Sequence, residues 1–200
     1  MTDIIGKTSE ASPVSVEVRS EAEREELIAL GILSEDRQVL PFILPPLYEQ
    51  HHQVVPRRAI QAKTVLNEAY DYPRPSSFSR SLRIELGNYS LFLISGTASV
   101  DENGKTVYVG DFRAQCWRTY RNTTELLKSE GATWRDIVRT TCYLRDIERD
   151  YRDFNEVRTA FFTWLGLNPL PASTGIQARL CREDLLVEID AIAILRNKPD

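Results

Sequence analysis

An acidic residue, Glu188, interrupts a mainly apolar run near the end of the chain, which extends from Leu185 to Ile194. A run with this many apolar residues predicts a strand that is covered on both faces. An ionised carboxylate is costly there unless it is paired or hydrogen-bonded, and burial raises its pKa toward neutrality. Such a carboxyl group can protonate a substrate carbon or nitrogen, or orient a water molecule. Glu188 is therefore the candidate general acid or base. A structural carboxylate hydrogen-bonded to the strand backbone is the alternative.

A small polar turn, Ser95-Gly96-Thr97, follows the apolar segment 89–94. Glycine allows close approach of the backbone, and the two hydroxyls supply hydrogen-bond donors for a carboxylate or a water molecule. We interpret the three residues as candidate substrate contacts, with an ordinary strand-end turn as the alternative. Arg80 and Arg83 lie on the preceding predicted strand, and a guanidinium binds carboxylates through two hydrogen bonds. Arg80 is the preferred candidate, although a solvated surface role fits either arginine.

The elements that must position these residues follow from hydrophobic spacing and turn residues. Two strands joined at Gly87-Asn88 precede a turn at 101–104. A helix capped by Asp111 then carries an apolar stripe and ends near Gly131. The expected strands are 81–86, 89–94, 106–109 and 137–144, followed by the final two, and the second helix is expected over 151–165. This order predicts an α+β fold with a mixed β-sheet and two helices on one face.

The first part of the chain has a different character. We expect an N-terminal extension over residues 1–70 and the main domain over residues 71–200. A capping box that begins at Ser20 predicts a short helix near 20–30, and a further short helix is expected over 59–70. Between them, prolines among apolar residues at 41–48 favour an extended strip laid over a protein surface.

Composition excludes several classes of function. The chain has 200 residues and a formal net charge of −4, which argues against a nucleic-acid partner. No apolar run approaches the ~20 residues of a membrane span, and no targeting segment is recognisable, so we expect a cytoplasmic protein without membrane contact. The three cysteines are widely spaced, and His51 and His52 lack neighbouring ligands, so neither disulfides nor a metal site is expected. Only Cys181 is a candidate for lining a site.

Several spaced motifs resemble the YjgF/YER057c/UK114 family, also called the Rid family. They include Pro171-Ala172, the run 178–180 and Val187-Glu188-Ile189, together with Ser95-Gly96 and the helix containing Asn155. The resemblance covers roughly residues 78–195. It implies a YjgF-like, chorismate-mutase-like fold, a homotrimer whose sheets line a closed barrel, a small carboxylate ligand and no cofactor. It also implies that Glu188 is catalytic, that Phe78 closes the pocket and that Asn155 supports it.

One departure from the family pattern bears on function. In the imine and enamine deaminases of the family an arginine follows the Pro-Ala pair and holds the substrate carboxylate. Here that position is Ser173, followed by Thr174, or Ala172 if the alignment slips by one. The segment 171–176 with 181–188 is instead similar to chorismatases, which hydrolyse an enolpyruvyl ether.

The resemblance therefore predicts a Rid-like hydrolase for an enamine, imine or enol-ether carboxylate. The alternative is a non-catalytic, ligand-binding or regulatory trimer that kept the pocket. Ribonuclease or inhibition of translation, which have also been attached to the family, gain no support from the acidic charge balance.

Overall fold

The computed structural model describes residues 18–30, 32–35, 55–63, 65–73 and 75–197, in two separate units that comprise residues 1–53 and 54–200. In the first unit, α1 (Glu21–Ala29) confirms the helix expected near 20–30. The Oγ atom of Ser20 accepts a hydrogen bond from the backbone N–H of Glu23 at 3.1 Å and so caps its N-terminus. The proline-containing strip at 41–48 and the histidine pair lie outside the described residues.

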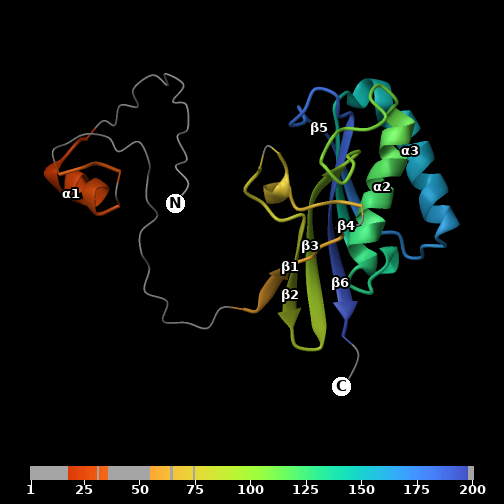
Figure 1. Cartoon of the computed structure of the whole chain (residues 1–200), viewed down its shortest axis with the longest axis horizontal. Coiled ribbons are helices and arrows are strands. Elements are labelled where there is room, and N and C mark those ends of the chain that lie inside the picture. The colour runs from red at the N-terminus through yellow and green to blue at the C-terminus, as the bar shows by residue number, and fades with distance from the viewer. Residues whose placement is uncertain (1–17, 31, 36–54, 64, 74, 198–200) are drawn as a thin grey trace. The chain divides into compact units, whose positions relative to one another are not determined.

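In the second unit, the described residues form a six-stranded sheet in the order β1-β2-β3-β6-β4-β5 (Figure 1). The pair β4–β5 is parallel and every other pair is antiparallel. A parallel pair needs a long crossover, which α3 supplies between β4 and β5. The strands are β1 (Arg57–Ala59), β2 (Ser81–Leu86), β3 (Tyr89–Ala98), β4 (Ile137–Leu144), β5 (Ala172–Gln177) and β6 (Val187–Arg196).

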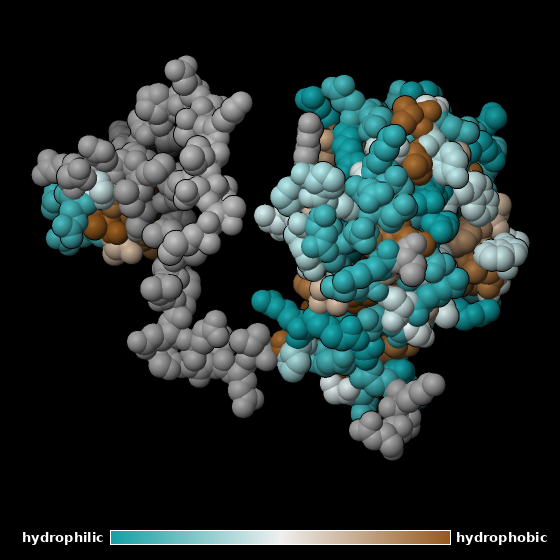
Figure 2. All heavy atoms as spheres, in the orientation of Figure 1, coloured by the Kyte–Doolittle hydropathy of each residue, from teal (hydrophilic) through white to brown (hydrophobic). Residues whose placement is uncertain are grey.

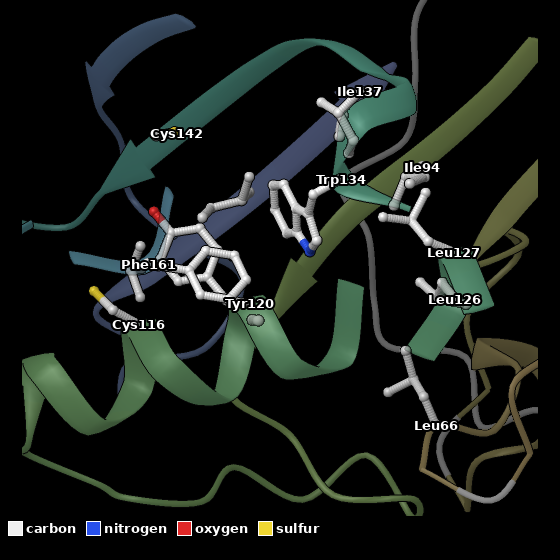
Figure 3. Packing of buried hydrophobic residues seen from close by; sticks show 14 of the residues in the cluster. Leu66, Ile94, Cys116, Tyr120, Leu126, Leu127, Trp134, Ile137, Cys142 and Phe161 are labelled. Carbon is white, nitrogen blue, oxygen red and sulfur yellow. The ribbon is translucent and has the colours of Figure 1, made fainter. Parts of the chain in front are cut away.

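Two amphipathic helices, α2 (Phe112–Lys128) and α3 (Ile147–Trp164), cover one face of this sheet (Figure 1). Their apolar stripes and the facing strands form the core. Tyr120 stacks on Phe161 with ring centroids 4.6 Å apart, and Trp134 meets Phe161 edge to face at 5.2 Å (Figure 3). The expected α+β fold with both helices on one face is confirmed.

Local differences from the sequence-based expectations have local causes. The prediction of a helix over 59–70 is wrong. Ala59 ends β1, Ala62 and Leu66 form an isolated β-bridge, and the described residues form helical structure only in the 3₁₀ turn Ala69–Asp71. The strand expected over 106–109 shrinks to a single bridge between Thr106 and Val100, because Tyr108 adopts a left-handed φ of 58° that ends the extended backbone. Helix α3 begins four residues before Tyr151, where Asp146 caps it.

The boundary between the units also differs from the division expected at residue 70. Residues 54–70 belong to the sheet unit, because β1 pairs with β2 at one edge of the sheet through Arg57, Arg58 and Ala59. A three-residue edge strand carries too little periodicity to stand out in a sequence. The chain leading to β2 is thus part of the structure that surrounds the site described below.

On the second face of the sheet, no helix is formed by the residues that the structure describes. Along β6, buried residues alternate with half-exposed ones, so the described chain covers only one face of this strand. The expectation that β6 is covered on both faces is therefore wrong for the single chain. Cross-strand pairing places one apolar set on the uncovered face, which we call the open sheet face: Leu82, Ile84, Leu91, Leu93, Ile192 and Ile194. The face of this unit seen in Figure 2 is mostly hydrophilic, with apolar side chains in scattered patches.

Candidate active site

Glu188 lies on β6, at the end of the open sheet face, between Ala98 of β3 and Tyr143 of β4. The pairing of β3 with β6 shifts between Ile94 and Thr97, as in a β-bulge, which places Gly96 directly beside the Glu188 side chain. A Cβ atom on Gly96 would lie only 1.9 Å from the Oε1 atom of Glu188. Glycine at position 96 therefore makes room for the carboxyl group.

The Glu188 carboxyl group is suited to hold a proton. Burial raises its pKa, Asp190 raises it further, and Arg80 and Arg182 act in the opposite direction. Within the described ranges no residue forms a hydrogen bond with this carboxyl group, so the alternative of a structural carboxylate bonded to its strand gains no support. Both oxygens are free to contact a ligand.

Arg80 provides a cation beside this acid. The side chain is held from two sides, because Nη2 donates to the Tyr72 hydroxyl at 2.5 Å and Nε donates to the carbonyl oxygen of Asn67 at 3.4 Å. The rings of Tyr72 and Phe78 flank the guanidinium, with centroids 4.9 and 5.2 Å from Cζ. The residue is only 6% exposed. Nevertheless, none of the described carboxylates forms an ion pair with it.

A buried acid anchors the same residue through the backbone. Glu68 is 2% exposed, and its Oε2 atom accepts a hydrogen bond from the N–H of Arg80 at 3.0 Å. Burial raises the pKa of Glu68. Arg83, the other candidate arginine, lies apart from this site, since its guanidinium pairs with Glu85 and Glu130 at 2.6 and 3.1 Å. The two arginines are thus clearly distinguished.

A pocket of about 690 Å³ brings together four of the predicted residues, Phe78, Arg80, Gly96 and Glu188. Its described charged residues are the cations Arg80, Lys105 and Arg182 and the single acid Glu188, and its walls also include Tyr72, Cys181 and Leu185. Phe78 is 42% exposed at this wall. The pocket therefore combines one acid with a cationic lining, on a chain whose net charge is negative.

Tyr72 and Arg182 escaped detection in the sequence, although both shape this pocket. Arg182 donates from Nη1 to the carbonyl oxygen of Gly104, and Gly104 has a left-handed φ of 75°. A Cβ atom at Gly104 would lie 2.4 Å from the Tyr72 ring, so this turn packs directly on the tyrosine. The sequence signals were the Asp101–Gly104 turn and the chorismatase-like segment 181–188, and neither revealed the contact between the two.

Ser95, Gly96 and Thr97 lie within β3 at the bulge, where the sequence suggested a turn after the strand, and the hydroxyl groups of Ser95 and Thr97 are engaged within the protein. The Oγ atom of Ser95 donates to the carbonyl oxygen of Ser79 at 2.7 Å. Thr97 is fully buried, and its Oγ1 atom donates to the carbonyl oxygen of Ser95 at 2.9 Å. Of the three residues, Gly96 lies on the pocket wall, while Ser95 and Thr97 brace the bulge behind it.

The remaining predicted residues lie elsewhere in the chain. Asn155 is on α3 and accepts a hydrogen bond from Arg158. Ser173 and Thr174 are on the exposed edge strand β5, where Ser173 contacts Thr140 at 3.0 Å and Arg158 at 3.2 Å. None of the three lines the pocket that contains Glu188.

Over the described part of the chain, no three His, Cys, Asp or Glu side chains form a group that could hold a metal ion. Nor is any helix in those ranges long and apolar enough to cross a membrane. Cys116, Cys142 and Cys181 are free, as expected, and Cys181 is the exposed member that reaches the pocket.

Known proteins share both the sequence pattern and the fold. Residues 75–195 match the family model described as Endoribonuclease L-PSP. The chain is 32% identical over 114 residues to a 2-iminobutanoate/2-iminopropanoate deaminase of Escherichia coli K12, which covers 56% of this chain and 84% of the relative. It is 30% identical over 104 residues to the 3-aminoacrylate deaminase RutC of Acinetobacter baylyi, covering 52% and 79%.

Solved structures also resemble this chain in fold. The YjgF gene product of E. coli has a TM-score of 0.55 and 26% identity, and the match covers 70% of this chain and 99% of that one. RidA from the Antarctic bacterium Psychrobacter sp. PAMC 21119 has a TM-score of 0.56 at 23% identity, covering 69% and 99%, and supports the fold. The sheet with two helices on one face and the match over residues 75–195 lead to one conclusion: the chain belongs to the Endoribonuclease L-PSP family, which is the YjgF/Rid family.

Proposed function

We propose that this protein hydrolyses small carboxylates that carry an enamine, imine or enol-ether group, with Glu188 as the proton donor and acceptor. One observation carries the proposal: a half-buried carboxyl group with a raised pKa and free oxygens lines the same pocket as an arginine without a carboxylate partner. The names of the relatives, an iminobutanoate/iminopropanoate deaminase and an aminoacrylate deaminase, support the class of reaction.

Arg80 takes the place of the arginine that is missing at Ser173. Arg80 lines the pocket, and its Nη1 atom forms no hydrogen bond with the described residues. A substrate carboxylate bound there would pair with an otherwise unpartnered, nearly buried cation, a strong charge-assisted contact. The rings of Tyr72 and Phe78 hold the guanidinium in place before the substrate arrives.

The chemistry proceeds in three proton-balanced steps. The protonated Glu188 transfers its proton to the carbon of an enamine, which leaves an iminium cation and a carboxylate. A water molecule then attacks the cationic carbon and returns one proton to Glu188. Collapse of the resulting amino alcohol releases ammonia and a ketone. An enol ether follows the same course through an oxocarbenium ion and releases an alcohol in place of ammonia.

A homotrimer is part of the proposal. The apolar residues of the open sheet face would otherwise contact water, and Leu93 and Ile194 are 38% and 45% exposed in the single chain. Burial against other copies of the chain would remove this apolar area from solvent, in the symmetric manner usual for homo-oligomers. Asn155, Ser173 and Thr174 would reach the pocket that contains Glu188 only if they came from a neighbouring subunit.

The decisive experiment compares the wild type with Glu188→Gln on 2-aminoacrylate generated in the assay, with ketone formation as the readout. The amide keeps the shape of the side chain but cannot transfer the proton, so turnover should fall by roughly 10²-fold or more. Glu125→Gln, which removes a carboxylate from the surface of α2, is the matched control and should retain full turnover. An active Glu188→Gln variant would refute the proposed role.

A second candidate, a ligand-binding trimer without catalysis, is favoured by the serine at position 173. In that case the wild type binds small carboxylates but releases no ketone from aminoacrylate, imine or enolpyruvyl substrates. Binding without turnover would thus select this candidate over the hydrolase.

A further inference from the structure

The cationic lining of the pocket exceeds what one substrate carboxylate requires. Arg80 is nearly buried beside the rings of Tyr72 and Phe78, while Arg182 and Lys105 lie on the loops that contain Cys181 and Gly104. Glu188 alone among the described residues brings a negative charge to the lining. A protonated Glu188 would leave three cations facing the pocket with no internal counter-ion.

Arg182 is positioned but not neutralised. Its Nη1 atom donates to the carbonyl oxygen of Gly104, which fixes the guanidinium against the turn packed on Tyr72. No described carboxylate pairs with it, although Glu183 and Asp184 are its neighbours in sequence. Asp184 instead accepts a hydrogen bond from the hydroxyl of Thr106 at 3.0 Å. The remaining donors of Arg182 are available to a ligand.

Tyr72 is linked to both arginines. Its hydroxyl accepts from Arg80, and its ring lies under Gly104, whose carbonyl oxygen binds Arg182. Both arginines lower the pKa of Tyr72, against the larger effect of burial, so both guanidinium groups are close to the same side chain. The pocket thus has two cationic positions, one held by the Tyr72 hydroxyl and one held by the turn that packs on the Tyr72 ring, and both arginines act to lower the pKa of Glu188 against the larger effect of burial.

We propose that the natural ligand carries two anionic groups, one bound by Arg80 beside Glu188 and the second bound by Arg182 and Lys105. This inference rests on the proposed pocket and specifies its substrate class: an enamine, imine or enol ether with a carboxylate near the reacting atoms and another carboxylate or a phosphate about a pocket width away. A guanidinium fixed before binding adds affinity for a second anion because less freedom is lost.

The test is equilibrium binding of unreactive probes to the full-length protein by calorimetry. Succinate carries two carboxylates, butyrate of similar length carries one, and 3-phosphonopropionate carries a carboxylate and a phosphonate. The wild type should bind succinate or the phosphonate at least tenfold more tightly than butyrate. Tighter binding of the phosphonate than of succinate identifies a phosphate-like second group, and the reverse order identifies a carboxylate. Equal affinity for all three probes overturns the proposal.

Variants assign the two positions. Arg182→Gln should remove most of the advantage of the dianions and leave butyrate binding unchanged, whereas Arg80→Gln should weaken all three probes. Lys105→Gln, which disturbs no hydrogen bond of the described residues, should reduce the same advantage by a smaller factor. Lys128→Gln removes an equal charge from α2 and should change nothing. If Arg182→Gln and Lys105→Gln both leave the preference for dianions intact, the assignment of the second anionic group to Arg182 and Lys105 is wrong.

These results are independent of catalysis. A preference for dianions together with a fully active Glu188→Gln variant would overturn the proposed mechanism and keep the ligand class. Loss of turnover in Glu188→Gln together with equal binding of the three probes would support the proposed mechanism and overturn the ligand with two anionic groups.

Discussion

A methyl group at position 96 should displace the carboxyl group of Glu188. The Cβ atom of Gly96→Ala would lie 1.9 Å from Oε1 and 2.9 Å from Cδ of Glu188. To reach even 3.0 Å, Oε1 must move by about 3.0 − 1.9 = 1.1 Å, because the neighbouring backbone atoms belong to paired strands. A shift of this size in a reacting group costs roughly 10²-fold in rate. We therefore expect turnover of Gly96→Ala to fall by about that factor.

The same clash has a cost in stability that a double-mutant cycle isolates. Forcing an extra methyl group into a packed site typically costs about 1–3 kcal/mol. The three nearest atoms to the added carbon all belong to Glu188. In a Glu188→Ala background, Gly96→Ala should therefore change the free energy of unfolding by less than about 0.5 kcal/mol. Urea denaturation of the four proteins, with aminoacrylate turnover of the wild type and Gly96→Ala, provides the measurements.

Two results would refute this reasoning. Full activity of Gly96→Ala would show that the carboxyl group need not occupy its present position. An equal loss of stability in the presence and absence of the Glu188 side chain would show that the alanine strains the bulge itself, so that Glu188 is not the cause.

Four further predictions concern stability, assembly and activity. Because burial raises the pKa of Glu188 in the folded state, the folded protein binds this proton more tightly, and wild-type stability should fall as pH rises from the ordinary pKa of a glutamate through the raised one. Glu188→Gln should show a smaller fall than the wild type when urea unfolding is followed from about pH 4 to about pH 8, because the buried Glu68, whose pKa is also raised, remains; parallel curves would contradict the assignment. Tyr72→Phe removes the acceptor of Arg80 and should cost about 1 kcal/mol in urea unfolding and weaken butyrate binding; unchanged binding would show that Arg80 needs no such support. Leu93→Lys should reduce the sedimentation mass from about three times 22.9 kDa to a single chain, whereas a monomeric wild type would contradict the trimer. Ser173→Arg should raise aminoacrylate turnover by adding a second carboxylate clamp from the neighbouring subunit, and no change would argue against a shared pocket.

The sheet and its two helices could be predicted because their signals are local and repeat along the sequence. The apolar stripe of α2 and its capping residue Asp111 identify this helix without reference to the rest of the chain, whereas the start of α3 at the cap Asp146 was missed. The strand order, by contrast, depends on pairing between distant segments, and β6 lies between β3 and β4. The motifs shared with the Rid family supplied what the spacing alone could not.

The site was predicted in part for similar reasons. Glu188 stands out because a carboxylate in an apolar run is unusual in itself, and Gly96 was indicated by the Ser-Gly pair shared with the Rid family. Tyr72 and Arg182 have no such local mark, since their roles arise from contacts with Arg80 and Gly104, up to 78 residues apart in the sequence. The hydroxyls of Ser95 and Thr97 were counted as free donors, but only the folded bulge reveals their backbone acceptors.

The position of Tyr72 means that part of the pocket wall lies outside the region that matches the family. The family match begins at residue 75, yet Ala69, Tyr72 and Pro73 form part of the pocket wall, and Glu68 and Asn67 anchor Arg80 from the same segment. A chain trimmed to the matched region would keep the acid and the arginine but lose the groups that hold the arginine still. The support of Arg80 thus comes from the segment that leads into β2, so a change in this segment can alter how the proposed ligand is held while Arg80 and Glu188 themselves stay unchanged.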